Sequence, residues 1–181
     1  MPASPPRILI RPGSVVTMDP SRRVLPGGAL VVTGSSIESV LTAPELAALP
    51  PFDGTVFDAP ALTAIPGFIQ THIHLCQTLF RGLADDLELL DWLRLKIYPY
   101  EAAHNAASMH ASAMNGIAEL IRSGTTTIMD MGSVGNEEEI AAAVEETGLR
   151  AFIGKAMMDS NEANIIDAFA ATCRAEILAI A

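Results

Sequence analysis

Cysteine, aromatic residues and basic residues are all scarce in this chain of 181 residues. The two cysteines, Cys76 and Cys173, cannot build a disulfide framework, and neither belongs to a CxxC pair. This indicates a reducing compartment and excludes a metal site made of sulfur alone. With 11 Lys and Arg against 21 Asp and Glu, the net charge is -10. We therefore expect neither a nucleic-acid polymer nor an anionic membrane as a partner.

Long apolar runs are also missing. No run approaches the roughly 18 residues that span a bilayer, and the start, MPASPPR, lacks the apolar core of a secretory signal. We therefore predict a cytoplasmic protein. The hydrophobic fraction is nevertheless 50% and only 18% of the residues are charged, which is typical of a globular chain with a buried core.

Short apolar stretches separated by turn-forming residues occupy the segment 7–60. They read RILIRPGSVVTM, ALVVTGSSIESVL and TVFDA, with clusters of Gly, Pro, Asp and Ser between them. This pattern predicts a small β unit, to which we assign residues 1–61. From residue 62 onwards, ALTAIPGFIQTHIHL is typical of a buried strand that enters a loop.

Helical patterns alternate with short apolar strands in the rest of the chain. The predicted elements are helices at 101–123, 137–147 and 161–181 and strands at 125–131 and 150–157. The first two helices end before Gly124 and Gly148, which suit a left-handed cap. Such βα repeats favour a parallel sheet with helices outside, in a barrel or a doubly wound sheet. The GxGxxG and GxxxxGK(S/T) loops of nucleotide-binding doubly wound folds do not occur, which favours the barrel.

Two of the four histidines form the sequence Thr71-His72-Ile73-His74 at the end of the strand-like run. Residues i and i+2 of a strand project to the same face, so both imidazoles face one point while Ile73 faces away. Neutral imidazole is a good ligand for zinc, iron or nickel, and active sites of barrels lie at this end of the strands. From the pattern alone, a histidine pair that hydrogen-bonds to backbone is at least as good an interpretation.

The surrounding sequence decides between these interpretations. It reads PGFIQTHIHLCQTLFRGLADDLELLDWL and then IYPYE, with ELIRSGTTTIMDM and GLRAFIGKAMMD further on. These stretches resemble the TRZ/ATZ branch of the amidohydrolase superfamily, which includes methylthioadenosine/S-adenosylhomocysteine deaminases, related adenosine deaminases, guanine deaminases and triazine hydrolases. The resemblance implies a β-sandwich beside a metal-dependent (β/α)8 barrel. It also implies one divalent metal, zinc first and iron as the alternative, bound by His72 and His74.

The expected fold class is therefore α/β, with part of a small β-sandwich at 1–61 and the first three βα units of a TIM barrel at 62–181. A barrel takes about 250 residues, so we expect a truncated one. The family's further metal ligands and its catalytic Glu and His would lie C-terminal to this chain, which leaves no catalytic residue within it. His104 and His110 are interpreted as surface or packing residues. Asp130, at a strand end, has either a structural role or one in the site.

Two residues are candidates for substrate binding. The resemblance places Glu101 where the glutamate of the methylthioadenosine/S-adenosylhomocysteine deaminases binds the ribose hydroxyls, and the alternative is a first-turn acid favoured by the helix dipole. Trp92 is a candidate wall over a flat heterocycle, although its helical spacing with Leu89 and Leu95 equally suits a core position. Lys155 stands where some of these deaminases carry Arg, which weakens an assignment to S-adenosylhomocysteine.

The predicted function is metal-dependent hydrolysis of a C–N or C–Cl bond in an aminated heterocycle, with an adenosine-type nucleoside or a purine as the first choice. The partner is then a small heterocyclic molecule, and we expect the full-length form to be a homo-oligomer. Two alternatives stay open: a non-catalytic truncated module for binding or assembly, and another amidohydrolase branch that acts on cyclic amides. The H-x-E and P-C-x-x-C motifs of the other zinc deaminase fold do not occur.

Overall fold

The structure, a computed structural model, describes residues 5–157 and mixes helices with strands, which confirms the α/β prediction. The chain divides into two compact units, Met1–Pro66 and a second unit that begins at Gly67. No helix within the described part is both long and apolar enough to cross a membrane. The helix predicted at 161–181 lies outside the described residues.

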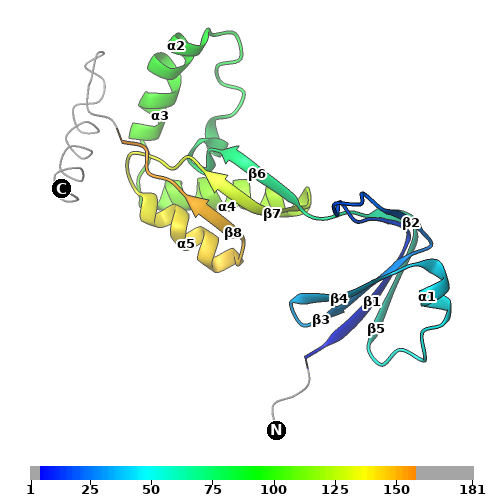
Figure 1. The fold of residues 1–181 in the computed structure, drawn as a ribbon. Coiled ribbons are helices and arrows are strands. Elements are labelled where there is room, and N and C mark those ends of the chain that lie inside the picture. Colours follow the sequence, from blue (N-terminus) through cyan, green and yellow to red (C-terminus); the bar gives the residue numbers. More distant parts are fainter. Residues whose placement is uncertain (1–4, 158–181) are drawn as a thin grey trace. The chain divides into compact units, whose positions relative to one another are not determined.

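The first unit is built on a five-stranded sheet of order β2-β1-β3-β4, in which β5 pairs with β1 in parallel (Figure 1). Its elements are β1 (Arg7–Val16), β2 (Val24–Pro26), β3 (Ala29–Thr33), β4 (Ser36–Leu41), the short helix α1 (Ala43–Ala47) and β5 (Thr55–Ala64). The buried core consists of Leu9, Ala29 and Val31. Residues 62–64 complete β5 and so belong to this unit.

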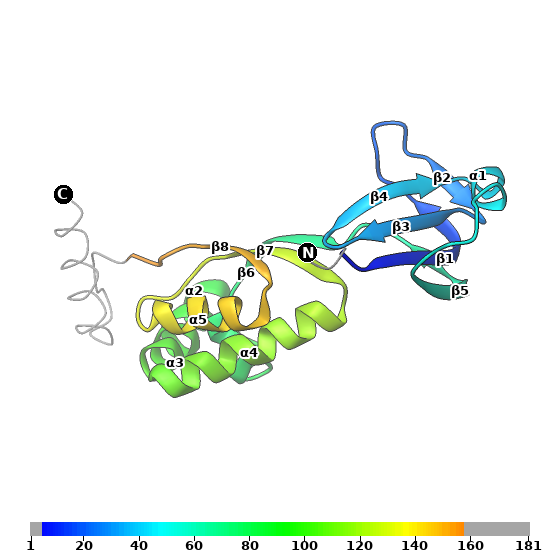
Figure 2. The same ribbon diagram turned by 90° about the horizontal axis from the view of Figure 1, so that it is seen from below.

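The second unit carries a three-stranded parallel sheet of order β6-β7-β8. Its elements are β6 (Phe68–Ile73), α2 (Leu89–Trp92), α3 (Tyr98–Ala102), α4 (Ala106–Arg122), β7 (Thr125–Asp130), α5 (Glu137–Thr147) and β8 (Arg150–Ile153). A 3₁₀ helix (Leu75–Phe80) follows β6, and a π-helical turn (Leu93–Ile97) joins α2 to α3. Helices α4 and α5 both lie along one face of the sheet (Figure 2).

Apolar side chains fill the space between this sheet and the two helices. The buried core is Leu75, Cys76, Met109, Ala113, Ile117, Ile128, Ile140, Ala143, Val144 and Leu149. The opposite face of the sheet is open in the described part of the chain: Met129 is 49% and Phe152 is 68% exposed. The prediction of a buried strand before the histidine pair was wrong in its burial, since Phe68 and Ile69 are 50% and 67% exposed. Strand β6 lies at the edge of this sheet, and α4 and α5 cover only one of its faces.

Helix α4 begins at Ala106 rather than at the predicted residue 101. Its N-cap is Asn105, whose side chain accepts the backbone N–H of Ser108 at 3.0 Å. In return, the Ser108 hydroxyl accepts the backbone N–H of Asn105 at 3.0 Å. This capping box satisfies two donors that a helix start leaves without partners, so it fixes the start of α4. Glu101 therefore lies in the preceding helix, α3.

The other predicted elements of this unit agree with the structure more closely. Helix α5 spans Glu137–Thr147 as predicted and ends at Gly148, which has a φ of +69°. Strand β8 starts at Arg150 as predicted but ends at Ile153, short of residue 157. The chain leaves the sheet at Gly154, whose N–H still donates to the carbonyl of Asp130 at 2.9 Å.

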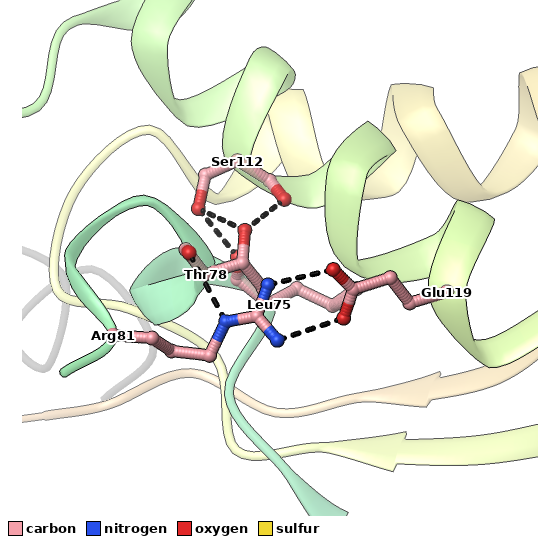
Figure 3. Close-up of polar contacts among 5 residues, drawn as sticks. All are labelled: Leu75, Thr78, Arg81, Ser112 and Glu119. Atoms are coloured by element: carbon pink, nitrogen blue, oxygen red, sulfur yellow. Dashed lines mark hydrogen bonds and ion pairs between the residues drawn. The ribbon is translucent and has the colours of Figure 1, made fainter.

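Polar contacts tie the 3₁₀ helix after β6 to helix α4 (Figure 3). The Ser112 hydroxyl donates to the carbonyl of Leu75 at 2.8 Å, and the Thr78 hydroxyl donates to the carbonyl of Ser112 at 2.5 Å. Arg81 donates to both carboxylate oxygens of Glu119, at 2.8 and 2.7 Å. The segment that follows the histidine pair is thereby held in one position on α4.

Candidate metal and substrate site

The structure brings the two predicted metal ligands together. His72 lies in β6 and His74 directly follows this strand. Ile73 packs against the core under the helices, so its two neighbours project from the open face of the sheet. The Nε2 atoms of the two imidazoles lie 3.2 Å apart, and the ring planes form an angle of 77°.

This arrangement fits two ligands of a divalent metal. Zinc binds histidine nitrogen at about 2.0–2.1 Å in tetrahedral geometry, which separates two ligand nitrogens by about 3.3 Å. Burial lowers the pKa of His74, and the neighbouring His72 lowers it further. The His74 ring is therefore neutral at pH 7, which is the state that binds a metal.

A cavity of about 180 Å³ adjoins His74. The polar side chains that line it are His74, Gln77, Tyr98 and Glu101. Apolar walls come from Leu93, Ile97, Met131 and Val134. Ligand pockets for whole drug-sized molecules measure about 300–1,000 Å³, so this cavity suits one ring of a ligand.

The structure places one of the two predicted substrate residues in this cavity. Glu101 lines it, from helix α3. Trp92 ends α2 and is half-buried, and it is not among the described residues that line the cavity. The next residue along the chain, Leu93, does line it. Trp92 is therefore the sequence neighbour of a lining residue and does not itself line the cavity.

Glu101 is buried, and two residues of the 3₁₀ helix donate to its Oε1 atom. Gln77 does so through Nε2 at 2.8 Å, and Cys76 through Sγ at 3.4 Å. Sequence reasoning missed Gln77, because nothing in a lone glutamine three residues after His74 points to a distant carboxylate. The only sequence signal is a general one: a buried acidic residue at position 101 needs a hydrogen-bond donor.

His74, Cys76 and Glu101 offer potential metal-binding atoms that all lie within 4.8 Å of one another. Cys76 is not well suited to be a ligand here, since thiolate is the form that binds metals. Burial raises the pKa of the Cys76 thiol, and the Glu101 carboxylate raises it further. The protonated thiol instead serves as a donor to Glu101.

Comparison with known proteins gives the family of this chain. The model of the amidohydrolase family matches residues 63–179, which is more than half of the sequence. The chain belongs to the amidohydrolase family. It is 40% identical over 152 residues to a 5′-deoxyadenosine deaminase of Methanococcoides burtonii, a match that covers 84% of this chain and 33% of the relative.

Two further similar proteins agree with this membership. A 5-methylthioadenosine/S-adenosylhomocysteine deaminase of Syntrophobacter fumaroxidans is 39% identical, over 84% of this chain and 34% of the relative. The crystal structure of an adenosine deaminase from Xanthomonas campestris with bound zinc superposes with a TM-score of 0.75 and 30% identity. That superposition covers 88% of this chain and 36% of the other. This amidohydrolase chain thus spans about a third of the length of the relatives it matches.

Asp130 has a structural role in this amidohydrolase chain. It ends β7 with 1% of its surface exposed. Its Oδ1 accepts the backbone N–H of Leu75 at 2.8 Å, and its Oδ2 accepts that of Gly132 at 2.9 Å. Burial raises the pKa of Asp130, against the lowering effect of these two hydrogen bonds. Because Leu75 follows His74 directly, Asp130 fixes the backbone on which the second imidazole stands.

The other two histidines take part in packing. The Nε2 atom of His104 lies 2.8 Å from the carbonyl oxygen of Cys76, and its Nδ1 atom lies 2.9 Å from the hydroxyl of Ser108. His110, on α4, lies within 4 Å of two glutamates of α5, at 3.8 Å from Glu139 and 3.4 Å from Glu146. These positions agree with their interpretation as packing or surface residues.

Proposed function

We propose that this chain provides the metal-binding strand and part of the substrate pocket of a hydrolase that deaminates a purine or an adenosine-type nucleoside. The observation that carries the proposal is the convergence of His72 and His74, at 3.2 Å, beside a cavity that contains Glu101. Relatives that match 84% of the chain are named as deaminases of 5′-deoxyadenosine and of 5-methylthioadenosine and S-adenosylhomocysteine. Their names support this reaction class.

The strand arrangement supports a finer description of the fold. We propose that β6, β7 and β8 are the first three strands of a (β/α)8 barrel, and that the unit before β6 is part of a β-sandwich. The three strands are parallel and adjacent in chain order. The histidine pair stands at the C-terminal end of the first of them, where the active sites of such barrels are built.

One divalent metal, zinc with iron as the alternative, is the proposed cofactor of His72 and His74. The separation of the two nitrogens fits a tetrahedral site, and the similar adenosine deaminase from Xanthomonas campestris carries bound zinc. When bound, such a metal supplies a water with a pKa near neutrality and polarises the group under attack. Two imidazoles are fewer ligands than a zinc site uses, so other groups complete the shell.

The residues of the chain have distinct proposed tasks around this centre. His72 and His74 present two nitrogens on a rigid strand, and Asp130 holds the backbone directly after them. Glu101 accepts hydrogen bonds from hydroxyl groups of the substrate, because a buried carboxylate is a strong acceptor. Trp92, beside the cavity residue Leu93, is proposed as an outer wall of the pocket. The substrate is a small heterocyclic molecule.

Titration of the purified chain with zinc tests the proposal. We expect one equivalent to bind, weakly enough to be removed by dialysis against a chelator, because two imidazoles leave most of the coordination shell to water. His72→Ala and His74→Ala should each abolish this binding, whereas the matched control His110→Ala should retain it. Unchanged zinc binding by His72→Ala would show that the metal site lies elsewhere.

The same preparations test the reaction. Deamination needs a group that carries a proton from the attacking water to the departing nitrogen. Glu101 lines the cavity beside His74, and we propose that it serves the sugar end of the substrate. We therefore expect no release of ammonia from adenosine by the chain alone with zinc added. Zinc-dependent release that His72→Ala abolishes would show that the chain contains the proton carrier as well.

A further inference from the structure

Only one of the two carboxylate oxygens of Glu101 accepts hydrogen bonds from the described residues. Gln77 and Cys76 both donate to its Oε1 atom, at 2.8 and 3.4 Å. No hydrogen bond from residues 5–157 reaches Oε2. Oε2 is also not among the buried polar atoms that lack a partner. The second oxygen is therefore accessible, in a residue that lines the cavity beside His74.

We infer that Gln77 is a positioning residue: it holds Glu101 so that Oε2 accepts a hydrogen bond from a hydroxyl group of the ligand. This inference rests on the proposed function and adds the residue that sets its selectivity for hydroxyl-bearing ligands. A hydrogen bond from an amide to a carboxylate is charge-assisted and shorter than a neutral one. Without the amide, only the weak thiol donor of Cys76 still contacts Oε1, so the carboxylate can turn more easily.

The position of Gln77 in the chain gives this contact a second consequence. The backbone N–H of Gln77 donates to the carbonyl of His74 at 3.1 Å, so the two residues share one turn of the 3₁₀ helix. The turn therefore fixes the distance from the metal end of the site to the acceptor at Glu101. A ligand is bound well when the spacing between its reacting carbon and its hydroxyl matches this distance.

The cavity supports a sugar hydroxyl as the group that Glu101 accepts. Its volume of about 180 Å³ suits one ring. A ligand that covers Oε2 without offering a donor removes the hydration of this oxygen without compensation, so ligands without the hydroxyl are disfavoured. The ligand class is thus a nucleoside with a free hydroxyl on the sugar, in preference to a dideoxy analogue.

The test uses two nucleoside probes and one substitution at Gln77. In the zinc-loaded full chain, titration with adenosine and with 2′,3′-dideoxyadenosine gives the ratio of the two affinities. Gln77→Met keeps the length of the side chain and removes its donor. We expect this ratio to fall by about tenfold, the size of one charge-assisted hydrogen bond, while the affinity for the dideoxy analogue stays unchanged.

The matched control is Gln70→Met, the same change at an exposed position of β6. It should leave the ratio at the wild-type value. A purely structural role of Gln77 would weaken both probes equally, and that result, like an unchanged ratio, would overturn the positioning role and leave the proposed function standing. If zinc binds but neither probe binds to the wild-type chain, both the nucleoside proposal and this inference are wrong.

A double-mutant cycle shows whether Gln77 acts through Glu101. Glu101→Gln should lower the affinity ratio by itself, and adding Gln77→Met to it should cause no further fall. Independent, additive losses would overturn the inference. A readout that needs no ligand is the side-chain amide signal of Gln77 in nuclear magnetic resonance spectra. This signal should shift in Glu101→Gln, and an unchanged shift would show that the contact does not exist in solution.

Discussion

The two faces of the sheet β6-β7-β8 use polar side chains in opposite ways. On the face covered by α4 and α5, Asp130 is 1% exposed and both of its oxygens accept backbone hydrogen bonds. On the open face, the Nε2 atoms of His72 and His74 point to a common position and have each other as neighbours. The comparison shows that polar groups on the covered face maintain the fold, whereas those on the open face are available for a ligand.

Replacing Asp130 should have the largest effect on stability. Asp130→Ala leaves the backbone N–H groups of Leu75 and Gly132 without their acceptor in a buried place, at a cost of about 2–4 kcal/mol in the free energy of unfolding. Urea denaturation of the two proteins measures this difference. A loss below about 1 kcal/mol would mean that water replaces the carboxylate, and that the covered face is less closed than described.

The pH dependence of the stability difference between wild type and Asp130→Ala tests the burial of Asp130. Burial raises the pKa of Asp130, so the folded protein keeps this proton at a pH where the unfolded chain has released it. The associated stability is fully present below the ordinary Asp pKa of about 4 and is lost as the pH rises through the folded value. The difference in the free energy of unfolding between wild type and Asp130→Ala should therefore become smaller as the pH rises from about 4. A gap that widens would contradict the raised pKa.

A smaller loss is expected where α4 meets the 3₁₀ helix. A Cβ atom at Gly116 would lie 2.7 Å from Cγ2 of Thr78 and 2.9 Å from Cδ2 of Leu75. Thr78 cannot move away without losing its hydrogen bond to Ser112. Overpacking of this kind costs about 1–3 kcal/mol, and the better helix propensity of alanine returns about 0.5–1 kcal/mol. Gly116→Ala should thus lower the free energy of unfolding by about 1–2 kcal/mol.

Thermal and urea unfolding of Gly116→Ala and of a control, Asn115→Ala, measure this effect. Asn115 is the preceding residue of α4 and is exposed. Its replacement should leave stability unchanged or raise it slightly, because alanine is the better helix former. Equal stability of the two variants would mean that the 3₁₀ helix moves away from α4 without cost.

The smallest effect on stability belongs to the open face. His72 is exposed, so His72→Ala should change the free energy of unfolding by no more than about 0.5 kcal/mol in the absence of metal. The same substitution should remove zinc binding altogether. A loss of stability comparable to that of Asp130→Ala would show that the histidine pair is part of the folding core, and would remove the distinction between the two faces.

The elements of the second unit could be predicted from sequence where local signals are strong. The β-branched stretch TTTIMDM predicts β7, and the helical run that ends before Gly148 predicts α5, both close to the observed bounds. The start of α4 was missed although Asn105 and Ser108 form a capping box. Apolar residues continue through both α3 and α4, so periodicity alone does not separate the two helices.

The candidate site likewise has one part that the sequence predicts and one part that it does not. The convergence of His72 and His74 follows from the alternation of side chains along a strand, which sequence reveals directly. The contact of Gln77 with Glu101 joins residues 24 positions apart and depends on the irregular path through the 3₁₀ helix, the π-helical turn and α3. No periodicity encodes such a path. Exposure of β6 was also beyond sequence reasoning, because an apolar strand reads as buried whatever covers it.

The close approach of Gly132 and Gly154 limits how this protein can be redesigned. A Cβ atom at Gly132, where φ is +78°, would lie 2.1 Å from the carbonyl oxygen of Gly154. A library that randomises the loops after β7 and β8 would therefore contain many misfolded members if it included Gly132. Met131, Val134 and Ala156 line the cavity beside them. Diversity placed at these three sites, with both glycines kept, would alter which ligands are accepted while the two loops remain stacked.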